Sequence, residues 1–176
     1  SIAMGYNAGA SGAQSTAMGA LTTASGSAST AMGVNTTASG GSSTAMGNST
    51  TASGDNSTAM GYYTTASDYS STVIGQYNSS GSSATSANSF STSAPAFVIG
   101  NGTASNAKSD AFKVMFNGDA TVSNDLTVSG DVVISSDARL KSNIVSLGST
   151  LSKLLQIDGK SYTMKKDESE KQKIGL

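Results

Sequence analysis

The sequence predicts a mainly β fold, with a narrow β-solenoid over residues 1–75. Thr-Ala-Met-Gly at residues 16–19 alternates with Thr-Ala-Ser-Gly at residues 23–26, and the alternation continues, so that the full period is 14 residues. A fixed short period indicates one small structural unit that is stacked many times. The composition agrees, because only 12% of the residues are charged and small neutral residues dominate the first hundred positions. Disordered chains usually carry high charge instead.

Each 14-residue unit is expected to form two short strands joined by tight turns. A glycine at every seventh position would cost roughly 1 kcal/mol each in a helix, which excludes the coiled coil that a seven-residue period otherwise suggests. In a strand, Thr16 and Met18 face one way, and Ser15, Ala17 and Gly19 face the other. A methionine recurs once per unit, and we expect this column to fill the core. The column consists of Met4, Met18, Met32, Met46 and Met60, followed by Ile74.

A coil of this composition buries little apolar surface by itself. Stacking of coils offsets the entropy of ordering the chain, and three chains packed side by side would do so further. We therefore expect a homotrimer.

The composition also excludes several kinds of function. The net charge is −1, and eight of the ten basic residues lie from Arg139 onward, which argues against a nucleic-acid partner. The sequence has no cysteine and no histidine, so thiolate metal sites and histidine-based triads are excluded, and we expect no cofactor and no metal. No long apolar run is present, so we expect no membrane insertion. No pair of carboxylates of the kind used in glycan hydrolysis is evident before residue 135.

Residues 76–95 form a Ser-rich connector, and residues 96–135 are expected to form a β-rich neck. A new pattern begins at residues 97–102, and residues 111–116 alternate apolar and polar side chains. Asn117-Gly118 predicts a hairpin turn. Further short strands are expected at residues 120–122, 126–128 and 131–134. Because isolated hairpins are marginally stable, we expect the neck to be intertwined trimeric β-structure.

Residues 56–67 resemble the head repeats of trimeric autotransporter adhesins, which form a left-handed parallel β-roll, and related repeats occur in phage fibres. The sixth unit departs from the pattern, with Asp68 where earlier units have glycine. The turn positions vary, and exposed tyrosines often serve recognition. The candidate receptor-binding residues are therefore Tyr62, Tyr63, Tyr69 and Tyr77, unless they are merely tolerated loop residues. Because the sequence opens inside a repeat, we expect it to be part of a longer protein.

The sharpest motif is Ser-Asp-Ala-Arg-Leu-Lys at residues 136–141. Asn143-Ile144 follows, then a Leu-rich stretch that predicts an amphipathic helix from about Ser149, a strand from Lys160, a charged turn and an apolar run from Ile174. Taken alone, Ser136-Asp137 is most simply a helix N-cap. In this order, residues 136–176 resemble the intramolecular chaperone and auto-processing domain of phage tailspikes and fibres. The family's domain normally continues further, so we expect a truncated α+β segment here.

The resemblance implies self-cleavage between Ser135 and Ser136, with Ser136 as nucleophile and Lys141 as base. A serine hydroxyl needs a neighbouring base, and a lysine can serve where histidine is absent. Asp137 and Arg139 could support this site or be structural.

The combined expectation is a homotrimeric phage tail fibre for host attachment, whose C-terminal chaperone aligns the three chains. Repeats slip register easily because each unit resembles the next, and a C-terminal trimeriser would fix the register. The expected partners are the chain itself, other virion tail proteins, and a host cell-surface receptor or glycan. The alternative is a bacterial surface trimeric adhesin or stalk.

Overall fold

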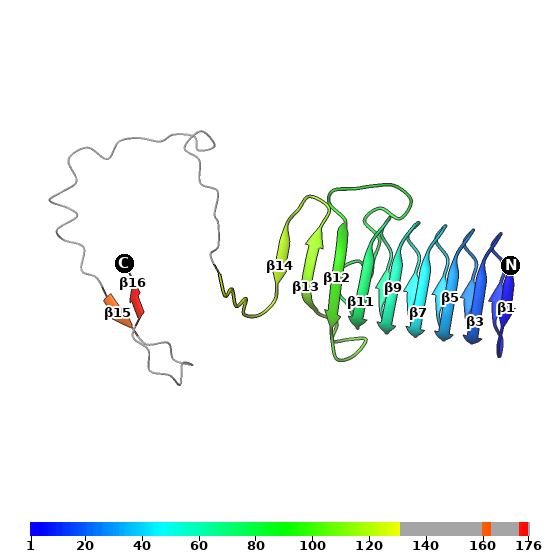
Figure 1. The fold of residues 1–176 in the computed structure, drawn as a ribbon, viewed down its shortest axis with the longest axis horizontal. Helices are drawn as coiled ribbons and strands as arrows, with labels where there is room; N and C mark the ends of the chain where they lie inside the picture. Colours follow the sequence, from blue (N-terminus) through cyan, green and yellow to red (C-terminus); the bar gives the residue numbers. More distant parts are fainter. Residues whose placement is uncertain (131–159, 163–172, 176) are drawn as a thin grey trace. The chain divides into compact units, whose positions relative to one another are not determined.

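The computed structural model of the 176-residue chain describes residues 1–130, 160–162 and 173–175. Two compact units are distinguished, Ser1–Thr127 and Val128–Leu176, and each is described by itself. All regular structure in the described residues is β-strand. Figure 1 shows the first unit as a row of strands stacked in chain order from β1.

Each of the first five coils contributes one longer strand to one sheet and one two-residue strand to a second sheet, and the sixth coil contributes a longer strand only. The long strands are β1 (Ile2–Met4), β3 (Thr16–Ala20), β5 (Thr30–Val34), β7 (Thr44–Asn48), β9 (Thr58–Tyr62) and β11 (Thr72–Gln76). The short strands are β2 (Gly9–Ala10), β4 (Thr23–Ala24), β6 (Thr37–Ala38), β8 (Thr51–Ala52) and β10 (Thr65–Ala66). All of these pairings are parallel and join equivalent residues of successive coils, as Met18 pairs with Met32. The predicted β-solenoid with two strands per unit is confirmed.

The interior between the two sheets is filled by alanine, together with small serine and threonine side chains. The side chains of one alanine from each strand are fully buried there, from Ala17 and Ala24 onward, and Val73 and Val98 continue the core. Glycine keeps successive coils at sheet spacing: Gly33 has φ +123°, and a Cβ atom placed on it would overlap the backbone carbonyl of Gly47. The repeat therefore retains small residues because the coil has no room for larger ones.

The predicted alternation along the strand is confirmed, but the prediction that methionine fills the core is wrong. Ala17 is fully buried, whereas Met18 is 39% exposed on the outer face. Two sheets that are joined by tight turns within 14 residues approach too closely to enclose a methionine column, so the smaller face of the strand turns inward.

The long-strand sheet continues past the repeats. Residues 77–94 leave the solenoid without forming a strand, and the chain then returns as β12 (Pro95–Asn101), followed by β13 (Asp110–Met115) and β14 (Ala120–Val122). β12 pairs in parallel with β11, so that Val98 lies beside Val73 and Gly100 beside Gly75. Residues 97–101 therefore continue the register of the repeat, where the sequence had suggested a new pattern.

β13 and β14 add to this sheet as antiparallel strands, which completes nine strands against five in the second sheet. The turn between β13 and β14 contains Asn117 and Gly118, with φ +94° at Gly118, as the hairpin prediction required. The strand predicted at residues 126–128 is absent from the structure. Leu126 there is 71% exposed and lies outside any strand.

In the second unit, β15 (Lys160–Tyr162) pairs antiparallel with β16 (Lys173–Gly175). This confirms the strand predicted from Lys160. The helix predicted from Ser149 and the strand predicted at residues 131–134 lie outside the described residues.

Candidate functional site

The outer face of the nine-stranded sheet carries a continuous column of apolar side chains. Strand pairing places these residues side by side on consecutive strands, one from each. The apolar column consists of Met4, Met18, Met32, Met46, Met60, Ile74, Ile99, Phe112 and Val122. Neighbouring strands lie about 4.8 Å apart, so the column is a ridge along the full length of the sheet.

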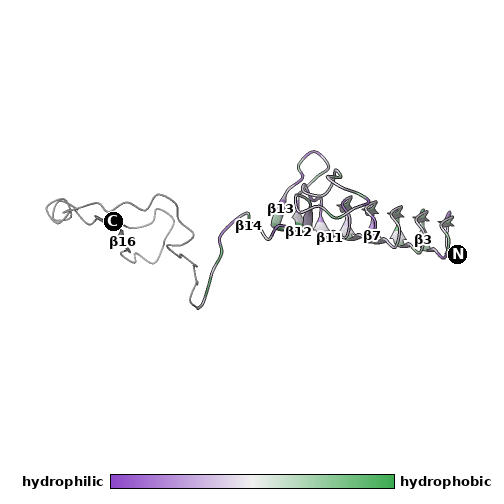
Figure 2. Ribbon diagram, turned by 90° about the horizontal axis from the view of Figure 1, so that it is seen from above, coloured by the Kyte–Doolittle hydropathy of each residue, from purple (hydrophilic) through white to green (hydrophobic). Residues whose placement is uncertain are grey.

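Among the described residues, nothing covers the apolar column. Met4, Met18 and Val122 are exposed, and the remaining members are half-buried by their neighbours on the same face. A threonine stands beside each of four methionines, as Thr44 does beside Met46, and Phe97 and Val114 widen the apolar surface over β12 and β13. Elsewhere the coils carry few strongly hydrophobic or hydrophilic residues, and their ribbon is mostly pale in Figure 2. The geometry of this face suits association with another flat sheet.

Residues 77–94 close the end of the five-stranded sheet. Asn78 is fully buried, and its amide binds both backbone groups of Thr65: Oδ1 accepts from the Thr65 N–H at 2.8 Å, and Nδ2 donates to the Thr65 carbonyl at 2.9 Å. The side chain of Asn78 thus pairs with the edge of β10 as a further strand would. A sheet edge protected in this way cannot pair with other chains.

Asp68 also holds residues 77–94 in place. Its Oδ1 accepts the backbone N–H groups of Thr85 at 2.5 Å and Ser86 at 2.7 Å. At the equivalent position Gly54 has no room for a Cβ, because the backbone of Asp68 stacks on it. No further coil of the repeat stacks on Asp68, so a side chain is allowed. The departure noticed in the sequence is therefore the capping residue of the solenoid.

Three of the predicted receptor-binding tyrosines form one aromatic cluster, at the turn that follows the long strands. The rings of Tyr63 and Tyr77 are stacked, with centroids 4.9 Å apart and planes 12° apart. The Tyr62 ring lies edge-on to both, at 4.7 Å from Tyr63 and 5.4 Å from Tyr77. Tyr62 and Tyr63 are 43% and 42% exposed, and Tyr77 is half-buried. We call these three residues the tyrosine cluster.

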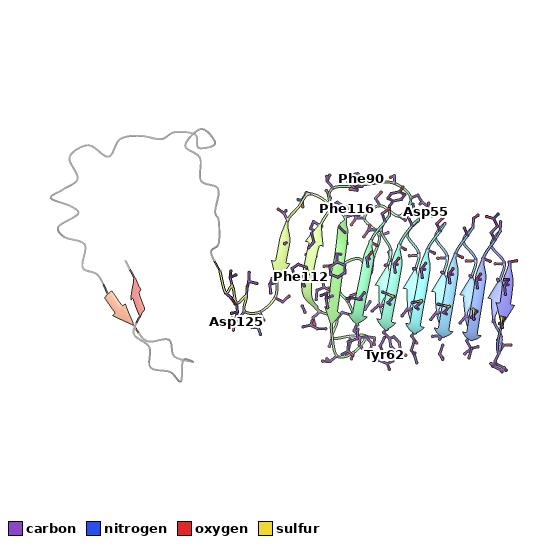
Figure 3. The ribbon with its side chains drawn as sticks, viewed as in Figure 1. Asp55, Tyr62, Phe90, Phe112, Phe116 and Asp125 are labelled. Atoms are coloured by element: carbon purple, nitrogen blue, oxygen red, sulfur yellow. The ribbon has the colours of Figure 1, made fainter. Side chains whose placement is uncertain are left out.

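The fourth predicted tyrosine lies elsewhere. Tyr69 is half-buried on the opposite turn, where its backbone N–H donates to the Ser86 carbonyl at 2.8 Å. Figure 3 places Tyr62 at one edge of the sheet and Asp55, Phe90 and Phe116 at the other. The structure therefore separates Tyr69 from the tyrosine cluster. The sequence signal for the cluster was its spacing, because Tyr63 and Tyr77 are one 14-residue period apart.

Partial desolvation raises the pKa of Tyr77 above its ordinary value, and the neighbouring phenol of Tyr62 raises it further. The neutral phenol is therefore the form that the cluster favours.

A polar pocket of about 370 Å³ lies beside β13, beyond the end of the five-stranded sheet. Its lining includes Lys108, Asp110 and Lys113. The Asp110 carboxylate accepts the backbone N–H groups of Ser79 and Ser80, both at 2.8 Å, so Asp110 anchors the start of the connecting segment. In the described part of the chain no group of three or more acidic, histidine or cysteine side chains could hold a metal ion.

The residues predicted to carry self-cleavage lie outside the described residues. These are Ser136 and Lys141, with the supporting Asp137 and Arg139. Of the C-terminal segment, the structure describes only the β15–β16 pair. The described ranges contain no helix that is long and apolar enough to span a bilayer.

The first unit is thus a repetitive β-solenoid with an uncovered apolar face and a capped end. Comparison with known families gives two matches. Residues 1–22, 24–50 and 52–78 match the YadA head domain repeat, and residues 136–176 match the family described as chaperone of endosialidase. No curated protein and no solved structure matches the chain significantly.

The two family matches confirm the resemblances drawn from the sequence. Head repeats of this kind and the chaperone segment both imply association into a homotrimer. The combination is that of a trimeric adhesin or a phage fibre.

Proposed function

We propose that this chain is the shaft of a homotrimeric fibre on a phage virion, which attaches the particle to its host. The observation that carries the proposal is the union, in one chain, of adhesin-type head repeats with a C-terminal segment that matches the chaperone of endosialidase. The repeats supply a stiff, neutral rod whose turns are free to vary. The C-terminal segment supplies a means of assembling three such rods.

The apolar column supports the association of three chains. If three columns meet at a common axis, the methionine, isoleucine and phenylalanine side chains become buried against their copies. Full burial of one such side chain contributes roughly 1.5–3 kcal/mol, and each chain offers one on every strand of the nine-stranded sheet. Small threonines beside the column allow the sheets to approach closely.

The uniformity of the coils explains why a chaperone is needed. Met32 and Met46 stand in equivalent surroundings, so a chain displaced by one coil relative to its partners would bury almost the same surface. Only the parts outside the repeat distinguish the correct register, which are β12–β14 and the C-terminal segment. A C-terminal segment that associates first would fix the register before the coils pair.

The C-terminal segment is proposed to cleave itself once. The Ser136 hydroxyl attacks the carbonyl carbon of Ser135 while Lys141 accepts the proton. The peptide C–N bond breaks, the proton passes to the departing amine of Ser136, and water hydrolyses the resulting ester. Cleavage removes the assembly segment, so the trimer is held by the slow rate of unfolding.

Two measurements test the proposal. Light scattering is expected to give three times the mass of the full chain for the uncut Ser136→Ala variant, and three times the mass of residues 1–135 for the wild type once it has cleaved itself. Met46→Asp, which places a carboxylate in the apolar column, is expected to dissociate the trimer, whereas the matched variant Asn48→Asp, at the exposed end of the same strand and outside the column, is not. A wild-type monomer would refute the fibre.

Self-cleavage is tested separately by mass spectrometry. A new N-terminus at Ser136 is expected in the wild type and is expected to be absent from Ser136→Ala and Lys141→Ala. If all three chains stay intact, or all three are cut, the assignment of the two residues is refuted.

The second candidate is a trimeric adhesin on a bacterial surface, which the match to YadA head repeats favours. The two candidates differ in location. Peptides of the chain are expected in purified virions if it is a phage fibre, and in the cell-surface fraction of uninfected bacteria if it is an adhesin.

A further inference from the structure

The tyrosine cluster occupies positions at which the solenoid needs no aromatic residue. Tyr63 and Tyr77 have φ +51° and +42°, in the left-handed region that bulky residues avoid. At the equivalent turn position, earlier coils use Asn7, Leu21, Asn35 and Ser49, with φ between +50° and +57°, so three of the four residues are small and polar. Asparagine tolerates this conformation better than tyrosine. The turn itself therefore does not explain the two tyrosines.

Burial in the core does not explain them either. The core is the alanine column with Val73 and Val98, and the rings of Tyr62 and Tyr63 lie outside it with two fifths of their surface exposed. Non-glycine residues held at unfavourable φ are concentrated at functional sites, because selection retains the strain only where the side chain is used. The cluster accordingly has the features of a recognition site.

The surroundings of the cluster indicate the chemistry of its ligand. Asn48 and Gln76 flank Tyr62 on the neighbouring strands of the sheet, and the Asn48 Oδ1 accepts from the Ser49 hydroxyl at 2.9 Å. Over residues 1–76 the only acidic residues are Asp55 and Asp68, and there is no basic one. Asp55 lies at the opposite edge of the sheet from Tyr62 (Figure 3). The tyrosine cluster and its strand neighbours are therefore aromatic, amide-bearing and uncharged. One cation and one anion, Lys108 and Asp110, adjoin them on either side of Ser109, whose backbone N–H donates to the Tyr77 carbonyl at 3.1 Å.

A neutral sugar ring has the complementary chemistry. One face of a pyranose presents C–H groups that pack on an aromatic ring, and its hydroxyls bond to amide and phenol groups at the rim. A folded protein partner would instead need about 800 Å² of surface on each side. The adjoining coil carries the small polar Asn48 and Ser49 at the equivalent positions, and these separate the tyrosine cluster from the exposed Val34 and Leu21 of earlier coils.

We propose that the tyrosine cluster binds a neutral pyranose of a cell-surface glycan, with the sugar packed against the rings of Tyr62 and Tyr63 beside Tyr77. This inference rests on the proposed attachment function and gives it a ligand class. In a trimer three copies of the cluster stand at one level of the fibre, so that weak binding at each is multiplied by simultaneous engagement.

The test uses the full chain with soluble cellotetraose, β-1,4-galactotetraose and chitotetraose as neutral probes, and polygalacturonate as an anionic probe. Binding is followed by saturation-transfer NMR and by tyrosine fluorescence, which is accessible because the chain has six tyrosines and no tryptophan. At least one neutral tetrasaccharide is expected to bind. The double variant Tyr63→Asn/Tyr77→Asn is expected to weaken that binding at least tenfold while its thermal midpoint stays equal or rises.

Leu21→Asn is the matched control. Leu21 occupies the same turn position, with φ +57°, three coils before Tyr63. The substitution is expected to relieve the same strain and to leave sugar binding unchanged.

Three outcomes would overturn the inference: no neutral tetrasaccharide binds, the double variant binds as the wild type does, or only polygalacturonate binds, which would indicate the polar pocket with Lys108 and Lys113. The mass of the same samples by light scattering keeps the two proposals apart. A trimer that adsorbs to host cells without binding the neutral sugars overturns the sugar site alone, whereas a monomer overturns the fibre.

Discussion

Replacing Thr36 by valine is expected to stabilise the solenoid. Thr36 is fully buried, and its Oγ1 atom has no hydrogen-bond partner among residues 1–130. The same is true of the equivalent residues of three other coils, which are Thr22, Thr50 and Thr64. Valine has almost the same shape and places a methyl group where the hydroxyl stood.

The size of the effect follows from two contributions. A buried polar group without a partner costs about 1–3 kcal/mol, and this cost disappears with the hydroxyl. Burial of the added methyl group contributes up to about 0.8 kcal/mol. We therefore expect the free energy of unfolding to rise by about 2 kcal/mol per chain, which raises the thermal midpoint of a domain of this size by roughly 4–8 °C.

The matched control is Ser43→Ala, which removes a hydroxyl that has a partner. The Ser43 Oγ donates to the Gly40 carbonyl at 2.7 Å in the same interior. Its loss is expected to lower the free energy of unfolding by about 1 kcal/mol. Both variants are compared by denaturant unfolding and by thermal unfolding at equal concentration. If Thr36→Val destabilises the protein as Ser43→Ala does, the reasoning is refuted, and an internal water bonded to the threonines becomes the better explanation.

Three further predictions concern the coil spacing, the cap and the tyrosine cluster. Gly33→Ala is expected to lower the free energy of unfolding by about 3 kcal/mol, because the new Cβ meets the Gly47 backbone and φ is unfavourable for alanine. Gly9→Ala, where the Cβ meets open space, should be nearly neutral. Equal effects of the two substitutions would contradict the packing argument. Asp68→Gly is expected to release the segment around Thr85 and Ser86, seen as faster amide hydrogen exchange there, whereas Asp68→Asn, which keeps the Oδ1 acceptor, should retain most of the protection. Because folding raises the pKa of Tyr77 above 10.0, the contribution of this group to stability is fully present below pH 10 and is lost as the pH rises through the pKa of the folded state. A titration followed by phenolate absorbance should show a step above pH 10 that Tyr77→Phe removes.

The repeat region was largely predictable from its sequence, because its signals are local. Alternation along residues 15–19, glycine at fixed intervals and small neutral side chains together specify two short strands per unit. The Asn117-Gly118 turn is equally local, and its hairpin was found. Leu126 shows the limit of the same reasoning, because an alternating pattern forms a strand only where a partner strand is available.

The candidate sites also differ in how much of them the sequence could predict. The chemistry of Ser136 and Lys141 was inferred from a motif, and it stays a prediction that the Ser136→Ala and Lys141→Ala variants test. The tyrosines were proposed as a set of four, but their arrangement depends on the coil. The 14-residue period stacks Tyr77 on Tyr63, whereas Tyr69, half a coil away, lies at the opposite turn.

By itself the sequence determined the period, the strands, the alternation of side chains and the absence of histidine- and cysteine-based chemistry. These follow from local backbone preference and composition. Only the tertiary structure decided which face of the strand turns inward, because that depends on the distance between two sheets. At the spacing that alanine and glycine allow, Ala17 is enclosed and Met18 is left outside, so the column expected to be the core of one chain is an uncovered surface instead. The return of the chain to register at Val98 also depended on long-range pairing, and it extends that surface from the repeats to Phe112.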